Sequence, residues 1–178
     1  MRVFVTGAGR CGTGTFSGAL SAHVTNFTVA HESQCEKPPW TYPDNHIEVD
    51  PRLLWQLPSL LRTYPDAYWV ILDRDRAAMA RSLGSRQEIM DAWHRVAFGT
   101  LQSPDVEAFV EFVYSALEAL LRDHDRVTRL VTPVDRETFE VFWSAIGAEG
   151  DLTGACLALK EVRNEGAVSC AWAGDLCT

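Results

Sequence analysis

Residues 1–16, MRVFVTGAGRCGTGTF, constrain the fold of this chain more than any other segment. A short apolar run at 3–5 leads into a glycine-rich turn, and an amphipathic segment begins near Thr13. Glycines let the backbone approach a phosphate closely, so that successive N–H groups point at it. The positive end of the following helix adds to this attraction. We therefore predict that residues 7–15 form an anion-binding loop for a phosphorylated nucleotide or cofactor.

Two common nucleotide-binding motifs match this segment in part. The loop of nucleoside triphosphatases, G-x-x-x-x-G-K-[ST], fits the spacing of Gly7 and Gly12, but Thr13 stands at the lysine position. Without that lysine the main contact to the β- and γ-phosphates is lost. The dinucleotide motif G-x-G-x-x-G fits Gly7, Gly9 and Gly12, and Glu32 follows about 20 residues later, where an acid meets the ribose. An NAD(P)-binding Rossmann oxidoreductase is therefore one alternative.

A third motif fits better. Residues 9–15, GRCGTGT, resemble the 5′-phosphosulfate loop of sulfotransferases that use 3′-phosphoadenosine 5′-phosphosulfate (PAPS). In that family an arginine after a later strand, with a serine eight residues on, holds the 3′-phosphate of the nucleotide. Arg74 and Ser82 have this spacing after the apolar run 68–72. The motifs span residues 1–85, and the dinucleotide hypothesis does not predict the second one.

The resemblance implies a P-loop-type, three-layer α/β fold and a set of site residues. Arg10 would neutralise the leaving phosphate, and the base that accepts the proton of the acceptor would be Glu32 or, as second choice, His31. No metal is required in this chemistry, because arginine and backbone N–H groups can stabilise the developing charge. The implied PAPS-binding residues are Gly9, Arg10, Cys11, Gly12, Thr13, Gly14, Thr15, Arg74 and Ser82.

The chain also departs from the family pattern. Arg76 stands where many members have a proline, and the segment 160–166 matches the lysine- and glycine-rich C-terminal nucleotide-binding segment of some members only weakly. The chain is short for the family, so a nucleotide-binding module without catalysis is a further alternative. For an enzyme, the acceptor would be a hydroxyl or amine of a small molecule or carbohydrate.

Apolar runs alternate with helical patterns, which predicts one α/β domain over residues 1–178 with a parallel sheet flanked by helices. Loops in parallel sheets bind ligands at the carboxyl ends of the strands. Residues 7–15, His31 with Glu32, and Arg74 should therefore converge on one cleft. We expect a loop at 34–46, strands at 2–6, 27–30, 68–72 and 127–131, and helices at 13–22, from Asp50-Pro51 onward, at 75–83, 87–98, from Ser103-Pro104 onward, and at 136–146.

Composition limits the partners and the compartment. The net charge of −8 disfavours nucleic acid, which binds basic surfaces. We expect no membrane span, because no run approaches about 20 apolar residues. Five cysteines without metal-ligand spacing, and no visible secretory signal, predict reduced thiols in the cytoplasm. Cys11 is interpreted as a small residue that fits the loop.

No motif in the sequence identifies the residues that would form an acceptor pocket. The segments 34–46 and 85–104 are expected to carry acceptor specificity, since variable loops usually do so. Trp40, Tyr42 and Trp93 are candidates for lining that pocket, and packing in the core or at its rim is the alternative for Trp40 and Trp93.

Overall fold

The computed structural model describes residues 1–34, 40–86 and 105–160. The elements are β1 (Arg2–Thr6), α1 (Thr13–His23), β2 (Thr28–His31), β3 (His46–Val49), α2 (Leu53–Thr63), β4 (Tyr68–Arg74), α3 (Arg76–Gly84), α5 (Val106–Leu121), β5 (Val127–Thr132), α6 (Arg136–Ala145) and α7 (Leu152–Ala158). Strands and helices alternate along much of the chain, although β3 directly follows β2 and α7 directly follows α6.

The five strands form one sheet in the order β2-β3-β1-β4-β5, and all paired strands are parallel. β1 lies at the centre, where Val3, Phe4 and Val5 are completely buried. This is the expected environment of a continuous apolar strand in a parallel sheet. All carboxyl ends lie along one edge of the sheet, so the segment that follows β1 leaves from the middle of that edge.

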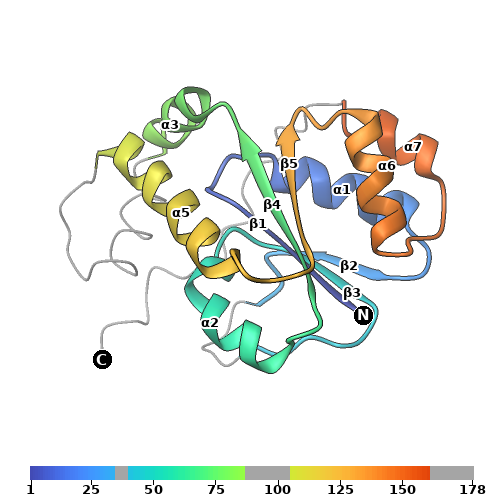
Figure 1. Cartoon of the computed structure of the whole chain (residues 1–178). Coiled ribbons are helices and arrows are strands. Elements are labelled where there is room, and N and C mark those ends of the chain that lie inside the picture. Colours follow the sequence, from blue (N-terminus) through green and yellow to red (C-terminus); the bar gives the residue numbers. More distant parts are fainter. Residues whose placement is uncertain (35–39, 87–104, 161–178) are drawn as a thin grey trace.

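Helices cover both faces of the sheet, which gives three layers (Figure 1). Helices α1, α6 and α7 pack together over one face, and α2, α3 and α5 pack over the other. The rings of Phe16, Phe139 and Phe142 meet between α1 and α6, with centroids 5.7 to 6.0 Å apart. On neighbouring strands Phe4 packs against Trp69, with centroids 4.8 Å apart. The predicted α/β fold is confirmed.

Strand β3 was not predicted, since 34–46 was expected to be loop and Asp50-Pro51 a helix start. The polar residues His46 and Glu48 made this segment look like a loop in the sequence, yet all four residues of β3 are buried. Burial is tolerated because His46 Nε2 lies 3.0 Å from Glu48 Oε2. Helix α2 begins only at Leu53 and continues through the exposed Pro58.

Other differences are smaller. Helix α7 was not predicted, and it begins after Asp151, whose side chain accepts a hydrogen bond from Gly154 N. Helix α5 is capped by Asp105, and the expected start at 103–104 lies outside the described residues, as does the expected helix 87–98. The remaining ends differ by one or two residues, as helix and strand ends commonly do. No helix in the described part of the chain has the length and apolarity needed to cross a bilayer.

Candidate functional site

The segment between β1 and α1, residues 7–15, is called the glycine loop below. A Cβ atom at Gly7 would lie 2.3 Å from the Leu72 carbonyl oxygen, so only glycine fits beside β4 at this point. Gly12 has φ +107°, in the left-handed region that favours glycine. It forms the N-cap of α1 and has no side chain to satisfy the first N–H groups of the helix. These donors suit an anionic ligand at the start of α1.

The two sequence motifs meet at this loop. Arg10 Nε donates to Ser82 Oγ over 3.1 Å, although 72 residues separate them. Arg74 Nη1 donates to the carbonyl oxygen of Arg10 over 3.2 Å. Two guanidinium groups and a hydroxyl from β4, α3 and the loop therefore gather at the carboxyl edge of the sheet. Such groups suit the oxygens of phosphate or sulfate.

Cys11 contributes only its backbone to the surface of the loop. Its side chain is completely buried. Burial raises the pKa of the thiol to about 12, against smaller opposing effects of hydrogen bonding. This agrees with the interpretation of Cys11 as a small residue that fits the loop rather than as a reactive thiolate.

We expect Cys11 to resist alkylation by iodoacetamide at pH 8, because roughly one thiol in 10,000 is ionised four pH units below its pKa. Mass spectrometry of the peptide that contains Cys11 measures the modified fraction over time. The same protein unfolded in guanidinium chloride provides the control, in which this peptide is alkylated rapidly. Equal rates in the folded and unfolded protein would contradict the burial of the thiol.

His31 is the last residue of β2 and Glu32 follows it, on the other side of the start of α1. His31 Cε1 lies 3.9 Å from the position of a Cβ at Gly14, so the imidazole borders the glycine loop. His31 Nε2 and Glu32 Oε1 are 3.8 Å apart, and both side chains are about one third exposed. Burial and the nearby Asp50 raise the pKa of Glu32, while His31 and Arg52 partly oppose this shift. A raised pKa suits a carboxylate that accepts a proton near neutral pH.

Sequence reasoning missed the groups that surround Glu32. Glu48 is fully buried and accepts hydrogen bonds from Ser33 N at 2.9 Å and Ser33 Oγ at 2.6 Å. Asp50 is fully buried and accepts from Arg52 Nε and Nη2, with a shortest distance of 2.7 Å. Burial lowers the pKa of the Arg52 guanidinium, but the bonds to Asp50 outweigh it and raise the pKa above its ordinary value. The signal in the sequence was the placement of 46, 48 and 50 at alternate positions, hence on one face of a strand.

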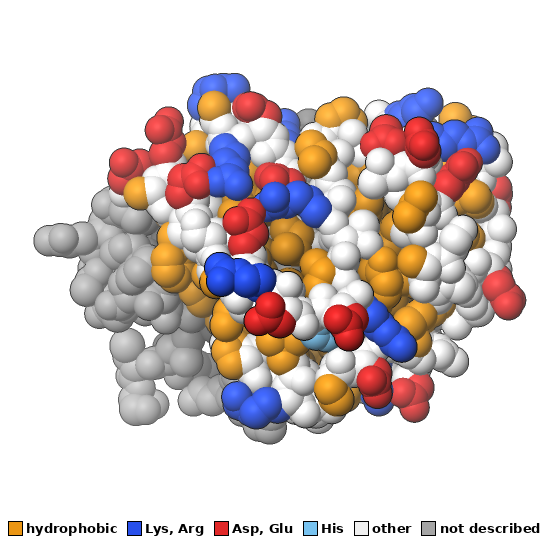
Figure 2. Space-filling view, viewed as in Figure 1, with side chains coloured by type: hydrophobic (Ala, Val, Ile, Leu, Met, Phe, Trp, Pro, Cys, Tyr) orange, Lys and Arg blue, Asp and Glu red, His pale blue; other side chains and the backbone are white. Residues whose placement is uncertain are grey.

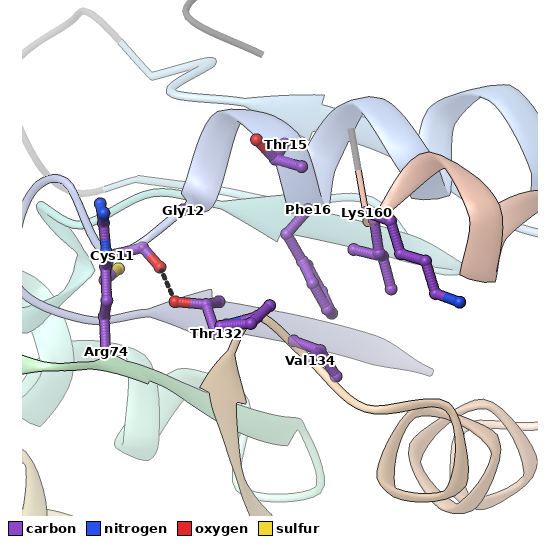
Figure 3. A pocket seen from close by; sticks show the side chains of 10 residues that line it. Cys11, Gly12, Thr15, Phe16, Arg74, Thr132, Val134 and Lys160 are labelled. Atoms are coloured by element: carbon purple, nitrogen blue, oxygen red, sulfur yellow. Dashed lines mark hydrogen bonds between the residues drawn. The ribbon is translucent and has the colours of Figure 1, made fainter. Parts of the chain in front are cut away.

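A cavity of about 230 Å³ lies on the side of the glycine loop away from His31. In Figure 3, Arg74 and Cys11 border one end of it, and Val134 and Lys160 border the other. Thr132 Oγ1 lies 2.8 Å from the Cys11 carbonyl oxygen and ties the end of β5 to the loop. The lining is mainly apolar with two basic side chains, and it comprises Cys11, Gly12, Thr15, Phe16, Arg74, Thr132, Pro133, Val134, Leu159 and Lys160.

Two of the three aromatic candidates for an acceptor pocket are core residues. Trp40 and Tyr42 are each 4% exposed and belong to the core, where Tyr42 packs edge-on against Phe4. Trp93 lies outside the described residues, and so do residues 161–166 of the weak C-terminal motif. Lys160, the first residue of that motif, borders the cavity.

The strand order counts against the dinucleotide alternative. In the classic dinucleotide-binding fold, the second strand lies directly beside the first. Here β3 lies between β1 and β2, so Glu32 follows a strand two places away. Neighbouring strands are about 4.8 Å apart, which puts β2 roughly 10 Å from β1. The pairing of Gly7, Gly9 and Gly12 with Glu32 therefore lacks the topology that the motif requires.

Charges are mixed on the face shown in Figure 2, where basic and acidic side chains lie next to one another. Ion pairs between α5 and the neighbouring β5 and α3 include Arg129–Glu118 and Arg76–Glu111. Within the described ranges, no group of three or more His, Cys, Asp or Glu side chains is placed to hold a metal ion. A search of known protein families finds no family model that matches the chain, and a search of curated proteins finds no matching relative.

Proposed function

We propose that this protein is a sulfotransferase that moves a sulfuryl group from PAPS to a hydroxyl or amine of an acceptor. The single observation that carries this proposal is the meeting of Arg10, Ser82 and Arg74 at the glycine loop. The two motifs were matched separately in the sequence, and nothing in their spacing required the side chains to touch.

The site has room and donors for the two ends of such a nucleotide. The N–H groups at the start of α1, together with Arg10, suit the 5′-phosphate, while Arg74 and Ser82 suit the 3′-phosphate. The apolar cavity beside Phe16 and Val134 suits a flat base, since such sites are mostly apolar with few polar groups. The absence of a side chain at Gly7 and Gly12 leaves the close approach that a phosphate needs.

The two sides of the loop differ in a way that supports transfer rather than binding alone. The cavity lies towards β5, whereas His31 at the end of β2 borders Gly14 and Glu32 is the next residue. The donor supplies a sulfuryl group whose bond to the 5′-phosphate breaks as the bond to the acceptor forms. Glu32 takes the proton of the acceptor, and Arg10 with the loop N–H groups stabilises the charge left on the phosphate.

Replacing Arg10 or Arg74 with alanine tests the nucleotide site. A hydrogen bond to a charged group contributes about 1.5 to 3 kcal/mol, so each variant should bind adenosine 3′,5′-bisphosphate roughly 10- to 100-fold more weakly. Isothermal titration calorimetry measures this change. Arg126→Ala is the matched control, because Arg126 also donates to a backbone carbonyl, that of Asp66, but lies at the amino end of β5.

The same titrations with ATP and NADH separate the alternatives. Binding of the bisphosphate that is unchanged in both site variants would show that the site is assigned wrongly. Binding of NADH alone would instead favour the dinucleotide hypothesis. A ligand at about 100 times its Kd stabilises the fold by roughly 2.7 kcal/mol, so thermal unfolding provides a rapid first screen.

A further inference from the structure

Glu32 has an unusual backbone conformation for its residue type. Its φ is +50°, in the left-handed region, where residues other than glycine, asparagine and aspartate are uncommon. Such a conformation persists only where neighbouring contacts hold it, and it often marks a functional position. The contacts on either side of Glu32 show what holds it.

Hydrogen bonds to the neighbouring strand β3 hold this turn. Glu32 N donates to the Val49 carbonyl oxygen over 3.2 Å. The next residue, Ser33, donates from both its backbone N and its Oγ to the two carboxylate oxygens of Glu48, at 2.9 and 2.6 Å. The residue after the strained position is thus attached at two points to a carboxylate on β3. This clamp restricts the rotation of the chain at Glu32.

Glu48 is itself held firmly. His46 Nε2 lies 3.0 Å from Glu48 Oε2, and His46 Nδ1 lies 2.9 Å from Thr28 Oγ1. The Thr28 hydroxyl also lies 3.3 Å from the Asn45 carbonyl oxygen, so it either donates to His46 Nδ1 or accepts from Nδ1–H. In both arrangements Nε2–H donates to Glu48. Burial raises the pKa of Glu48, but the bonds from His46 and Ser33 outweigh it and leave the pKa below its ordinary value. In the chain Thr28–His46–Glu48–Ser33, Glu48 is therefore an ionised acceptor that is held in place.

We propose that Glu48 is a positioning residue, which acts through Ser33 to hold Glu32 in its left-handed conformation with the carboxylate beside His31 and the glycine loop. This role rests on the proposed function, in which Glu32 accepts the proton of the acceptor. Burying a carboxylate in an interior strand such as β3 costs free energy unless the carboxylate is hydrogen-bonded, whereas a buried apolar side chain needs no hydrogen-bond partner. The hydrogen bonds that Glu48 accepts from Ser33 explain why a carboxylate occupies this position.

The first arm of the test does not depend on any activity. The ¹³Cα and ¹³Cβ chemical shifts of Glu32, measured by NMR on the free protein, report its backbone conformation. We expect Ser33→Ala and Glu48→Gln to shift them from left-handed towards extended values, whereas Ser33→Thr retains them. Glu48→Gln keeps the shape of the side chain but loses the oxygen that accepts from Ser33 Oγ. Unchanged Glu32 shifts in both Ser33→Ala and Glu48→Gln would overturn the proposal, whatever the protein does.

Thr138→Ala is a closely matched control for Ser33→Ala. Thr138 also donates from its backbone N and its Oγ1 to the two oxygens of one carboxylate, that of Asp135. This pair lies at the start of α6 and borders neither the glycine loop nor Glu32. We therefore expect Thr138→Ala to leave the Glu32 shifts unchanged, and a change there would show that the readout follows general loosening of the fold.

The second arm measures turnover of PAPS with 2-naphthol, tyramine and glucosamine as acceptors. Ser33→Ala should lower kcat roughly 10- to 100-fold, because small misplacements of a catalytic group are costly, and should leave KM for PAPS unchanged. In the background of Glu32→Gln, Ser33→Ala should have no further effect, since it acts through Glu32. Additive losses would overturn the positioning role. Absence of transfer by the wild type would count against the proposed function, while the NMR arm would still decide whether Glu48 holds Glu32.

Discussion

Glu32→Gln is expected to lower the rate of sulfuryl transfer from PAPS by roughly 10²- to 10⁴-fold, the usual contribution of a general base. The amide cannot take the proton of the acceptor, yet it has nearly the same size as the carboxylate. Binding of adenosine 3′,5′-bisphosphate should be unchanged, because Arg10 and Arg74 lie on the other side of the start of α1. Transfer to 2-naphthol, tyramine and glucosamine, followed as release of the bisphosphate, measures the effect.

The pH dependence gives this prediction a second readout. Burial, and after it Asp50, raise the pKa of Glu32. Only the deprotonated carboxylate accepts a proton, so the rate should rise with pH through this raised pKa and level off above it. Glu32→Gln should abolish this acidic limb as well as lower the plateau.

Two further variants separate Glu32 from its neighbours. Glu149→Gln changes an exposed glutamate in the connection between α6 and α7 and should leave both the rate and the pH profile unchanged. His31→Gln tests the second candidate for the base. A larger loss in His31→Gln than in Glu32→Gln, together with the loss of the acidic limb, would assign the base to His31 instead.

The sequence predicted the contacts of Arg10, Arg74 and Ser82 at the glycine loop better than the surroundings of Glu32. Arg10, Arg74 and Ser82 belong to motifs whose spacing is fixed by strand, turn and helix, so their positions follow from local structure and parallel topology. The contact between Arg10 and Ser82 spans 72 residues, and only the family resemblance gave a reason to connect them. Convergence of Arg74 and the glycine loop at one edge followed from the strand ends alone.

The surroundings of Glu32 depend on β3, a strand that was not predicted because two of its four residues are polar. Ile47 and Val49 alternate with His46 and Glu48, a pattern that ordinarily predicts a half-exposed strand. In the structure both faces are buried, because the polar side chains satisfy one another across β2 and β3. The alternation could have indicated the strand, but the compensation that buries its polar face is a tertiary property and has no signal of its own in the sequence. The strand order, which places β3 between β1 and β2, could not be predicted for the same reason.

Asp50→Asn is expected to cause the largest loss of stability among the substitutions considered at this site. Asp50 is fully buried and the side chain of Arg52 is only 10% exposed, while their Nη2–Oδ2 distance is 2.7 Å. Removal of one partner of a buried ion pair leaves the other charge without its direct partner, which typically costs about 3 to 5 kcal/mol. For a chain of this length that corresponds to a decrease in Tm of roughly 6 to 20 °C, measurable by calorimetry.

A surface pair provides the matched control. Arg136 and Glu140 form an ion pair one turn apart on α6, with their Nε and Oε1 atoms 2.6 Å apart and both side chains exposed. Solvent and salt screen such a pair, so Glu140→Gln should leave Tm nearly unchanged. Equal losses in the two variants would contradict the view that burial decides the effect.

The double variant Asp50→Asn/Arg52→Met shows why the single loss is large. It removes the buried charge along with its partner, and an apolar side chain of similar volume often replaces a buried ion pair without a net loss. We therefore expect it to recover much of the Tm lost in Asp50→Asn. Recovery should be incomplete, because Arg52 also offsets the charges of Glu32 and Glu48. A double variant less stable than Asp50→Asn would mean that Arg52 stabilises the fold chiefly through those two carboxylates, and the pair with Asp50 would then be the smaller part of its role.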